Sequence, residues 1–120
     1  MSVELFVSQL TSTPEEIAFS DTMALIDSHF DYTPGRFTNG AGDSQAVNEA
    51  GTNEGSCKIF ALGKLLALDE AQTLHCFGDY YRVDVLSHPD GNDHANIRNF
   101  MAHGWAGIAF DNAVLKAKGE

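Results

Sequence analysis

A cysteine at the start of a predicted helix is the first candidate for chemistry. The segment Gly51–Lys58 is a glycine-bearing loop that leads into a helical run beginning at Cys57. Helix N-termini favour a thiolate or an anion, so Cys57 beside Lys58 could act as a nucleophile. The same loop could instead bind a phosphate group, but it lacks the GxxxxGK[ST] spacing of phosphate-binding loops, and Glu54 would repel phosphate. In the structural alternative, Ser56 caps the helix and Cys57 packs as a small apolar residue.

His94 is the candidate base for this nucleophile. With Asp93, Asn96 or Asn99 orienting its ring, His94 would accept the proton of Cys57, following the nucleophile, base and orienting-group arrangement. The resulting hypothesis is a cysteine-dependent hydrolase or transferase with Cys57, His94 and Asp93 as catalytic residues. It requires the thiol and the imidazole to meet in the fold.

The loop around His94 also carries donors that metals accept. Imidazole and carboxylate are ligands of first-row metals, and this loop offers His88, Asp90, Asp93 and His94. No HExxH spacing is present, and Met101 stands at the twelfth position counted from Asp90, where an EF-hand requires Glu. Turns commonly collect Asp and His for local hydrogen bonds. We therefore predict no bound metal and no cofactor, with the four residues kept as an alternative.

A third polar cluster lies in residues 79–84. Asp79 and Arg82 stand one helical turn apart, as do Tyr80 and Asp84. These residues could form the lip of a ligand pocket, and Tyr81 and Arg82 are its candidate contacts. The structural alternative is an ion-pair network in which Arg82 holds the carboxylates.

The elements that position these residues begin with two short helices. Residues 3–10 are amphipathic and form the first helix. For the second, Thr13, Pro14 and Glu16 are typical of a helix start with a capping box. Alternatively, residues 16–19, which alternate polar and apolar, form a short strand, and Ser20 caps a helix over residues 21–29. The inward side chains expected in the first helix are Leu5, Phe6 and Leu10.

Extended and irregular segments are expected elsewhere. Pro34 favours an extended conformation over residues 32–39. Residues 38–56 are rich in Gly, Asn and Ser, which predicts loop and turn. A short strand is expected over 105–110, and the tail 116–120 is expected to fray.

Three further helices complete the prediction. The first follows Ser56. The second starts at Asp69, with Gln72 completing a capping box, and continues to Val85. Asp93 is expected to cap the third helix, which ends at Gly104 and buries Ile97, Phe100 and Met101.

Composition limits the classes of function. The 120 residues include 17 acidic and 7 basic side chains, a formal charge of −10. Nine acids and one base lie in residues 1–57. Such a chain repels nucleic-acid phosphates, so we expect no nucleic-acid partner. No apolar stretch is long enough to span a membrane, Glu4 is untypical of a signal peptide, and two separated cysteines suit a reducing cytoplasm. We predict a single domain over residues 1–120.

Four blocks of sequence resemble the HopJ type III effector family. They are FTNG at 37–40, AGTNEGSCKIFA at 50–61, TLHCFGDYYRVDVL at 73–86 and DHANIRNFMAHGWAGIAF at 93–110. The resemblance covers about residues 14–110. It implies an α+β domain with about five helices around a small curved sheet of three to four short strands. It also implies a bacterial cytoplasmic protein or, if the protein acts as an effector, one delivered into a host cell.

The hypothesis that we carry forward is a binding protein without established chemistry. Its predicted ligand contacts come from two loops that lead into helices, because the costly polar residues cluster there. They are Asn53, Glu54, Ser56 and Lys58 in the first loop, Asn96 and Arg98 in the second, and Tyr81 and Arg82 beside them. The partner is a protein or a small molecule, the oligomeric state stays open, and the cysteine enzyme is the alternative.

Overall fold

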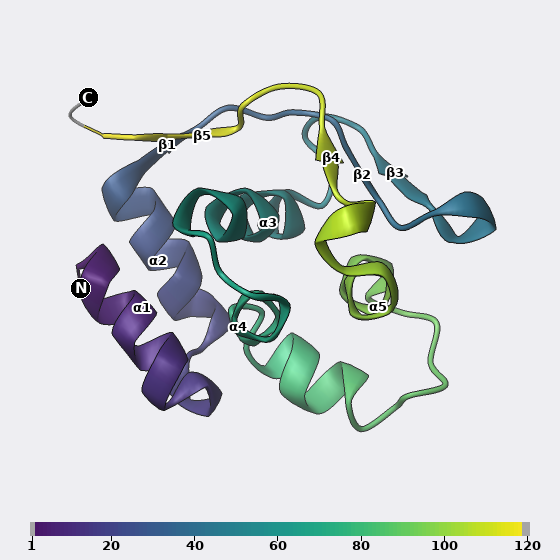
Figure 1. The fold of residues 1–120 in the computed structure, drawn as a ribbon, viewed down its shortest axis with the longest axis horizontal. Coiled ribbons are helices and arrows are strands. Elements are labelled where there is room, and N and C mark those ends of the chain that lie inside the picture. The colour runs from purple at the N-terminus through teal and green to yellow at the C-terminus, as the bar shows by residue number, and fades with distance from the viewer. Residues whose placement is uncertain (1, 119–120) are drawn as a thin grey trace.

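Two helices at the N-terminal end lie side by side in the computed structural model, which describes residues 2–118 (Figure 1). The first, α1, spans Val3–Ser12. Phe6 and Leu10 are four residues apart and both are buried in the core. Leu5 was expected to face inward but is exposed, because each residue turns the helix by about 100° and Leu5 lies beside the Phe6–Leu10 stripe.

The second helix is confirmed but begins earlier than expected. A single 3-10 turn, η1 (Pro14–Glu16), precedes α2 (Phe19–His29). The N–H of Ala18 donates to the Asp21 carboxylate at 3.0 Å. Ser20 lies inside the helix rather than at its cap, so that cap is wrong, and residues 16–19 form no strand. The helix start expected at Thr13 and Pro14 is a separate 3-10 turn.

The strands form two small antiparallel sheets. In the first, β1 (Phe30–Tyr32) pairs with β5 (Leu115–Ala117). In the second, β2 (Phe37–Asn39) lies between β3 (Ala46–Asn48) and β4 (Ala109–Phe110). Each sheet therefore joins strands that are distant in the sequence, and the second has β3 at one edge.

Three predictions for irregular segments need correction. Residues 38–56 contain strand β3 and a 3-10 turn, η2 (Gly42–Ser44), rather than loop alone. The expected strand over 105–110 is reduced to β4, since Gly104–Gly107 forms a 3-10 turn, η4. The tail does not fray at Lys116, which belongs to β5; residues 119–120 lie outside the described part. β4 and β5 are ordered by pairing with the distant strands β2 and β1, and β3 pairs with the nearby β2.

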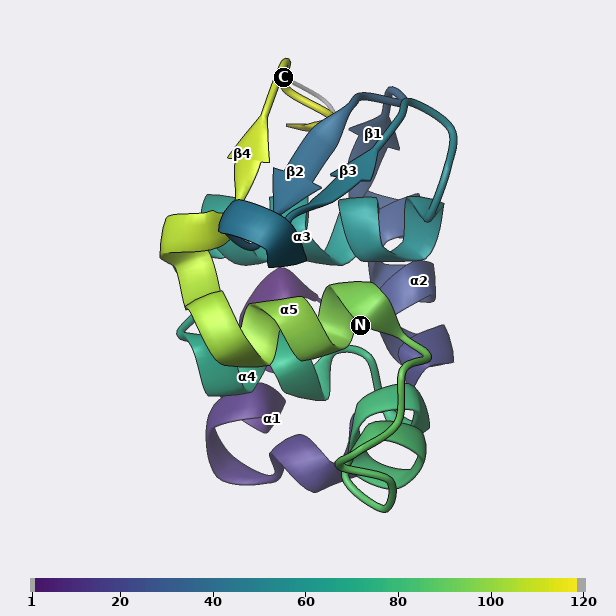
Figure 2. The ribbon, with the colours of Figure 1, turned by 90° about the vertical axis from the view of Figure 1, so that its right-hand side faces the viewer.

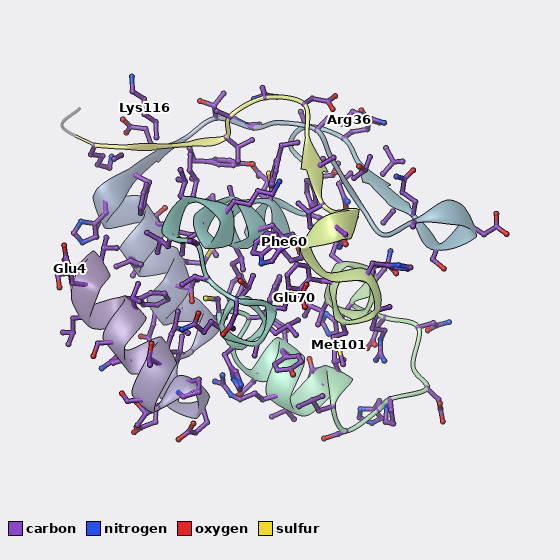
Figure 3. The ribbon with its side chains drawn as sticks, viewed as in Figure 1. Glu4, Arg36, Phe60, Glu70, Met101 and Lys116 are labelled. Carbon is purple, nitrogen blue, oxygen red and sulfur yellow. The ribbon has the colours of Figure 1, made fainter. Side chains whose placement is uncertain are left out.

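Helix α3 (Glu54–Leu66) crosses the centre of the molecule. Ile59, Leu62, Gly63 and Leu66 share one face at helical spacing; the first three are buried and Leu66 is partly buried. Phe60 is fully buried as well, and Figure 3 shows it in the interior while Glu4 and Lys116 lie at the outer surface. Its ring centroid lies 4.9 Å from that of Phe100, 5.5 Å from that of Phe77 and 6.0 Å from that of Phe37.

The helix expected from Asp69 to Val85 is divided in two. The predicted capping box is confirmed: Gln72 N–H donates to Asp69 at 2.7 Å and the Asp69 N–H donates to Gln72 at 3.0 Å. However, α4 (Glu70–His75) ends early, and a π-helical segment, η3 (Tyr80–Val85), follows. Gly78 separates them with φ of 62°. A Cβ there would lie 2.5 Å from the backbone nitrogen of Phe19, so the break allows close contact with α2.

The last helix, α5 (Ala95–His103), ends at Gly104 as predicted. Ile97 and Phe100 are buried, in agreement with the expected stripe. Met101 was expected to be buried but is 46% exposed. It follows Phe100 directly, so it points about 100° away from the buried stripe.

The elements form layers that are consistent with the α+β class. Figures 1 and 2 show the strands on one side of α3, with α4 and α5 on the other and α1 and α2 beside them. The predicted fold class is confirmed, although the strands divide between two sheets. None of the helices formed by residues 2–118 is long and apolar enough to cross a lipid bilayer.

Candidate functional site

The start of α3 is positioned by a residue with left-handed backbone. Asn53 has φ of 49° and ψ of 48°, and its side chain does not cap the helix. Instead, its Nδ2 donates to Oδ1 of Asn48 at 2.7 Å. Asparagine adopts this conformation more readily than most residues. The predicted cap at Ser56 is wrong, because the helix already begins at Glu54 and Ser56 lies within the first turn.

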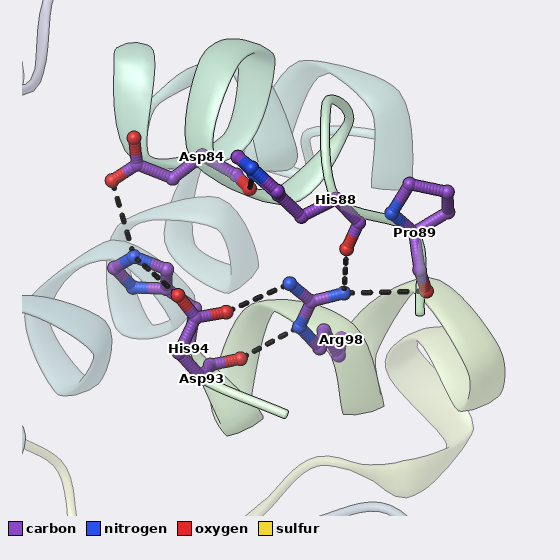
Figure 4. Close-up of polar contacts among 6 residues, drawn as sticks. All are labelled: Asp84, His88, Pro89, Asp93, His94 and Arg98. Atoms are coloured by element: carbon purple, nitrogen blue, oxygen red, sulfur yellow. Dashed lines mark hydrogen bonds and ion pairs between the residues drawn. The ribbon is translucent and has the colours of Figure 1, made fainter. Parts of the chain in front are cut away.

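The start of α5 repeats this geometry. His94 is the residue before the helix, with φ of 50° and ψ of 49°, and no side chain caps this helix. Its Nε2 lies 3.2 Å from an Asp84 carboxylate oxygen and 4.0 Å from one of Asp93 (Figure 4). The predicted cap at Asp93 is wrong, since that carboxylate pairs instead with Arg98 at 2.7 Å. This hydrogen bond lowers the pKa of Asp93.

Arg98 holds the loop that precedes α5. Its guanidinium donates to the carbonyl of Asp93 at 2.7 Å and to that of His88 at 2.8 Å. A longer bond of 3.4 Å reaches the carbonyl of Pro89, and Figure 4 shows these contacts around one side chain. Arg98 was predicted to contact a ligand. Its hydrogen-bonding groups are engaged by the loop, so its observed contacts position the loop.

Four asparagines connect the two helix starts to the three-stranded sheet. The Asn96 side-chain oxygen accepts from Asn39 and Asn48, each at 3.1 Å. Its Nδ2 donates to Asn48 at 2.9 Å, and Asn39 also donates to the backbone carbonyl of Asn96 at 2.8 Å. Asn53 joins this network through Asn48. Asn39, Asn48 and Asn96 are buried. Within residues 2–118, Oδ1 of Asn39 has no hydrogen-bond partner, but the other side-chain amide groups of these three residues are paired, and such a buried network fixes one arrangement of its elements.

A cavity of about 540 Å³ lies where these helix starts meet β3. Figure 2 shows that the first turns of α3 and α5 lie on the same side of the molecule. The two loops predicted to form a binding surface are therefore neighbours. The residues that line the cavity include Phe19, Val47, Asn48, Asn53, Ser56, Phe77, Tyr80, His94 and Asn96.

One wall of the cavity is aromatic. The rings of Phe19 and Tyr80 meet edge to face with centroids 5.1 Å apart, and the centroids of Tyr80 and His94 are 5.5 Å apart. Sequence reasoning missed Phe19, Val47 and Asn48, because no local signal places them near residues 94–96. Tyr80 was noticed only as part of its own segment.

The structure does not join Cys57 to His94. Cys57 is 1% exposed, and its thiol lies 3.8 Å from the carbonyl oxygen of Gly35. Burial raises the pKa of Cys57, opposite to what a nucleophile needs. Cys57 is absent from the cavity lining, and the contacts of the His94 ring are with Asp84, Asp93 and Tyr80.

Several other predicted contacts lie outside the cavity lining. Arg82 donates to backbone carbonyls of Ile17, Pro14 and His75, the last two at 3.1 and 3.2 Å. It therefore fastens η1 to α4, rather than holding the carboxylates of an ion-pair network. The Tyr81 ring packs edge-on against His75, with centroids 5.4 Å apart.

Lys58 and Glu54 also lie outside the lining. The Lys58 ammonium lies 4.8 Å from the centroid of the Tyr32 ring, a cation–π contact. Glu54 is exposed in the first turn of α3, where a carboxylate is stabilised by the helix dipole.

No metal site is formed in the described part of the chain. Within residues 2–118, no three side chains of His, Cys, Asp and Glu gather closely enough to hold an ion. Nδ1 of His88 lies 3.1 Å from the backbone carbonyl of Asp84, while Asp93 and His94 make the contacts described above. The alternative metal site at His88, Asp90, Asp93 and His94 is therefore not assembled.

Comparisons with known proteins agree with this fold. A family model described as HopJ type III effector protein matches residues 3–115. The chain is also similar to a crystal structure described as unknown function protein VPA0580. The two share 53% sequence identity with a TM-score of 0.93, and the match covers 98% of this chain and 95% of that chain. No curated protein gives a significant match to the sequence.

Proposed function

Because the chain belongs to the HopJ type III effector family, we propose that it acts as an effector by binding a target rather than by cysteine catalysis. The proposed site is the cavity between β3 and the first turns of α3 and α5. The observation that carries this proposal is the cavity itself, whose volume of about 540 Å³ falls in the range of small-ligand sites, about 300–1,000 Å³.

The lining has the mixture of surfaces expected of a recognition site. Phe19, Phe77 and Tyr80 offer apolar and aromatic area, while Asn53, Ser56 and Asn96 offer hydrogen-bonding groups. Binding pockets commonly combine a mostly apolar wall with a few placed polar groups. Of the predicted contacts, Asn53, Ser56 and Asn96 are the ones that we retain as ligand-binding residues.

The backbone at the cavity supports the same proposal. Asn53 and His94 both hold a left-handed conformation and both line the cavity. Such positions cost about 1–3 kcal/mol each and concentrate at functional sites. Here Asn48 holds Asn53, and Asp84 lies against His94, so both helix starts are fixed before any ligand arrives.

Family membership suggests delivery into a host cell, and we propose a host protein or a small molecule as the partner. A nucleic acid is not proposed, since a chain of charge −10 repels phosphates. An enzymatic role through Cys57 is not proposed either, because its thiol is buried and its pKa is raised by that burial.

The test uses three small probes that share a ring and differ in charge: benzamide, benzoate and benzylamine. Each is titrated into isotope-labelled protein, and backbone amide shifts are followed by NMR. At least one probe should shift the signals of Asn48, Asn53 and Asn96. Ser56→Phe, which fills the cavity, should abolish these shifts.

Ser28→Phe is the matched control, since Ser28 is an exposed serine on α2. It should leave the shifts unchanged. Binding that survives Ser56→Phe, or the absence of shifts at the cavity for all three probes, would overturn the proposal.

A further inference from the structure

The hydrogen bonds of the central strand β2 alternate between its two neighbours. Beyond the paired residues of β2 and β4, the Gly40 N–H donates to the carbonyl of Gly107 at 3.1 Å. In antiparallel sheets, hydrogen-bonded positions recur at every second residue. Thr38, two residues before Gly40, therefore bonds toward β4. Phe37 and Asn39 must then bond toward β3.

This alternation decides which groups of β3 remain free. Asn48 and Ala46 stand opposite Phe37 and Asn39, so their backbone groups point toward β2. Val47 lies between them, and its N–H and C=O point away from β2. β3 is the edge of its sheet (Figure 2). Among residues 2–118, no group forms a hydrogen bond with the outward N–H and C=O of Val47.

The cavity borders this free edge. Successive side chains of a strand point to opposite faces, so Val47 faces away from Ala46 and Asn48. Ala46, Val47 and Asn48 nevertheless all line the cavity. The cavity therefore extends around the edge of the strand instead of lying against one face only. The Val47 side chain is 50% exposed, and β3 carries neither lysine nor proline to block pairing with another strand.

The charge around this edge selects a partner. Asp43 precedes β3, and Glu49 and Glu54 follow it. Arg36, the single basic residue among the first 57, lies 3.5 Å from Glu49 and 3.4 Å from Asp111. A second copy of this chain would bring another charge of −10, whereas a basic segment would be attracted.

We propose that an extended, basic segment of a partner protein pairs with Val47 as an added strand and places an apolar side chain in the cavity. The inference rests on the proposed function, since it names the occupant of the same site. Strand addition supplies affinity through main-chain hydrogen bonds, and side-chain pockets supply specificity.

The test uses the capped peptide Ac-Lys-Val-Lys-Phe-Lys-Val-Lys-NH2 and its counterpart with Glu in place of Lys. NMR follows hydrogen exchange at the Val47 amide. The basic peptide should slow that exchange by about tenfold, as expected for one added hydrogen bond, and the acidic peptide should leave it unchanged. Two further versions of the basic peptide carry backbone N-methyl groups. One is methylated at Val, Phe and Val, and the other at the two inner lysines. Strand pairing requires that one of them loses binding while the other retains it.

A protein variant checks the same contact. Val47→Pro removes the outward N–H while sparing the bonds to β2, and proline is tolerated at such edge positions. It should lose peptide binding, whereas Val47→Thr, which keeps the N–H, should bind normally. If the Val47→Pro variant fails to fold, the N-methylated pair still decides.

The outcomes separate this inference from the proposed function. Equal binding of both N-methylated peptides, with unchanged exchange at Val47, would overturn strand addition while leaving a binding cavity. If the basic peptide fails to bind but benzamide, benzoate or benzylamine still occupies the cavity, strand addition is wrong and the proposed function stands. If neither the peptide nor any probe binds, both are wrong.

Discussion

Asn96→Ala tests whether the buried amides hold the two helix starts against the sheet. The Asn96 side chain is 8% exposed and makes three of the hydrogen bonds in the network. After truncation, Asn39 keeps its 2.8 Å bond to the Asn96 backbone carbonyl. Oδ1 of Asn48 keeps the bond from Asn53. The Nδ2 of Asn48, which donates to Asn96 at 3.1 Å, is the donor left without its partner.

The expected loss of stability follows from the hydrogen bonds that are lost and kept. One orphaned buried donor costs about 1–3 kcal/mol, and each satisfied hydrogen bond that is lost costs about 1 kcal/mol. Because Asn96 borders the cavity, water can reach part of the gap and reduce the penalty. We expect the free energy of unfolding to fall by about 2–4 kcal/mol. For a chain of this size that corresponds to a fall in Tm of about 8–15 °C.

The assay is urea and thermal unfolding, completed by a double-mutant cycle with Asn48→Ala. Since the two amides bond to each other, the cycle should give a coupling energy of about 1–2 kcal/mol. Asn92→Ala, in an exposed loop, is the matched control and should change stability by less than about 0.5 kcal/mol. If Asn96→Ala resembles this control, or if the two single effects are additive, the amides do not act as a network and the reasoning is refuted.

Three further predictions address groups outside the cavity. Arg82→Met should lower the free energy of unfolding, measured in urea, by about 2–4 kcal/mol, because the carbonyls of Pro14 and Ile17 lose a charged donor. Arg82→Lys should retain only part of the wild-type stability. If Arg82→Met leaves the stability unchanged, Arg82 does not hold these segments together. Cys57 should react with iodoacetamide only as fast as the protein unfolds, since burial protects the thiol and raises its pKa; rapid alkylation of the folded protein, measured by peptide mass spectrometry, would contradict this. Burial, and to a lesser extent the charge of Arg82, lowers the pKa of His75 in the folded protein. As the pH falls, the His75 of the unfolded chain is therefore protonated before that of the folded chain. Stability linked to neutral His75 is present above about pH 6.5 and is lost progressively below it. His75→Gln should therefore lose less stability than the wild type between about pH 7 and pH 5, and an unchanged pH dependence would refute the effect.

Local patterns in the sequence were sufficient for much of the secondary structure. The capping box of Asp69 and Gln72 and the stop at Gly104 are confirmed because their groups interact within one turn. The strands were harder to predict. β3 lies in a segment whose composition indicates turns, and β5 lies in a tail expected to fray. β5 is ordered by pairing with β1, far away in the sequence, and β3 by pairing with β2 and by the bond between Asn48 and Asn96 of α5. Local composition encodes neither set of contacts.

The caps at Ser56 and Asp93 failed for a related reason. Capping preferences describe how a side chain bonds to the first backbone N–H groups of its helix. The Asp93 carboxylate bonds instead to the side chain of Arg98 in that same helix, and the helix after Asn53 starts early because Asn48 of β3 holds Asn53. A competing side-chain partner decided each end.

The family, the α+β class, the acidic charge and the two loops in which polar residues concentrate could all be derived from the sequence. These properties depend on composition and on local order along the chain. Three features are visible only in the folded molecule: the two loops meet, Phe19, Val47 and Asn48 complete one cavity between them, and Cys57 is buried against Gly35 instead of facing His94. The physical reason is that a cavity and a thiol's surroundings are properties of packing among distant elements, which no spacing within one segment specifies.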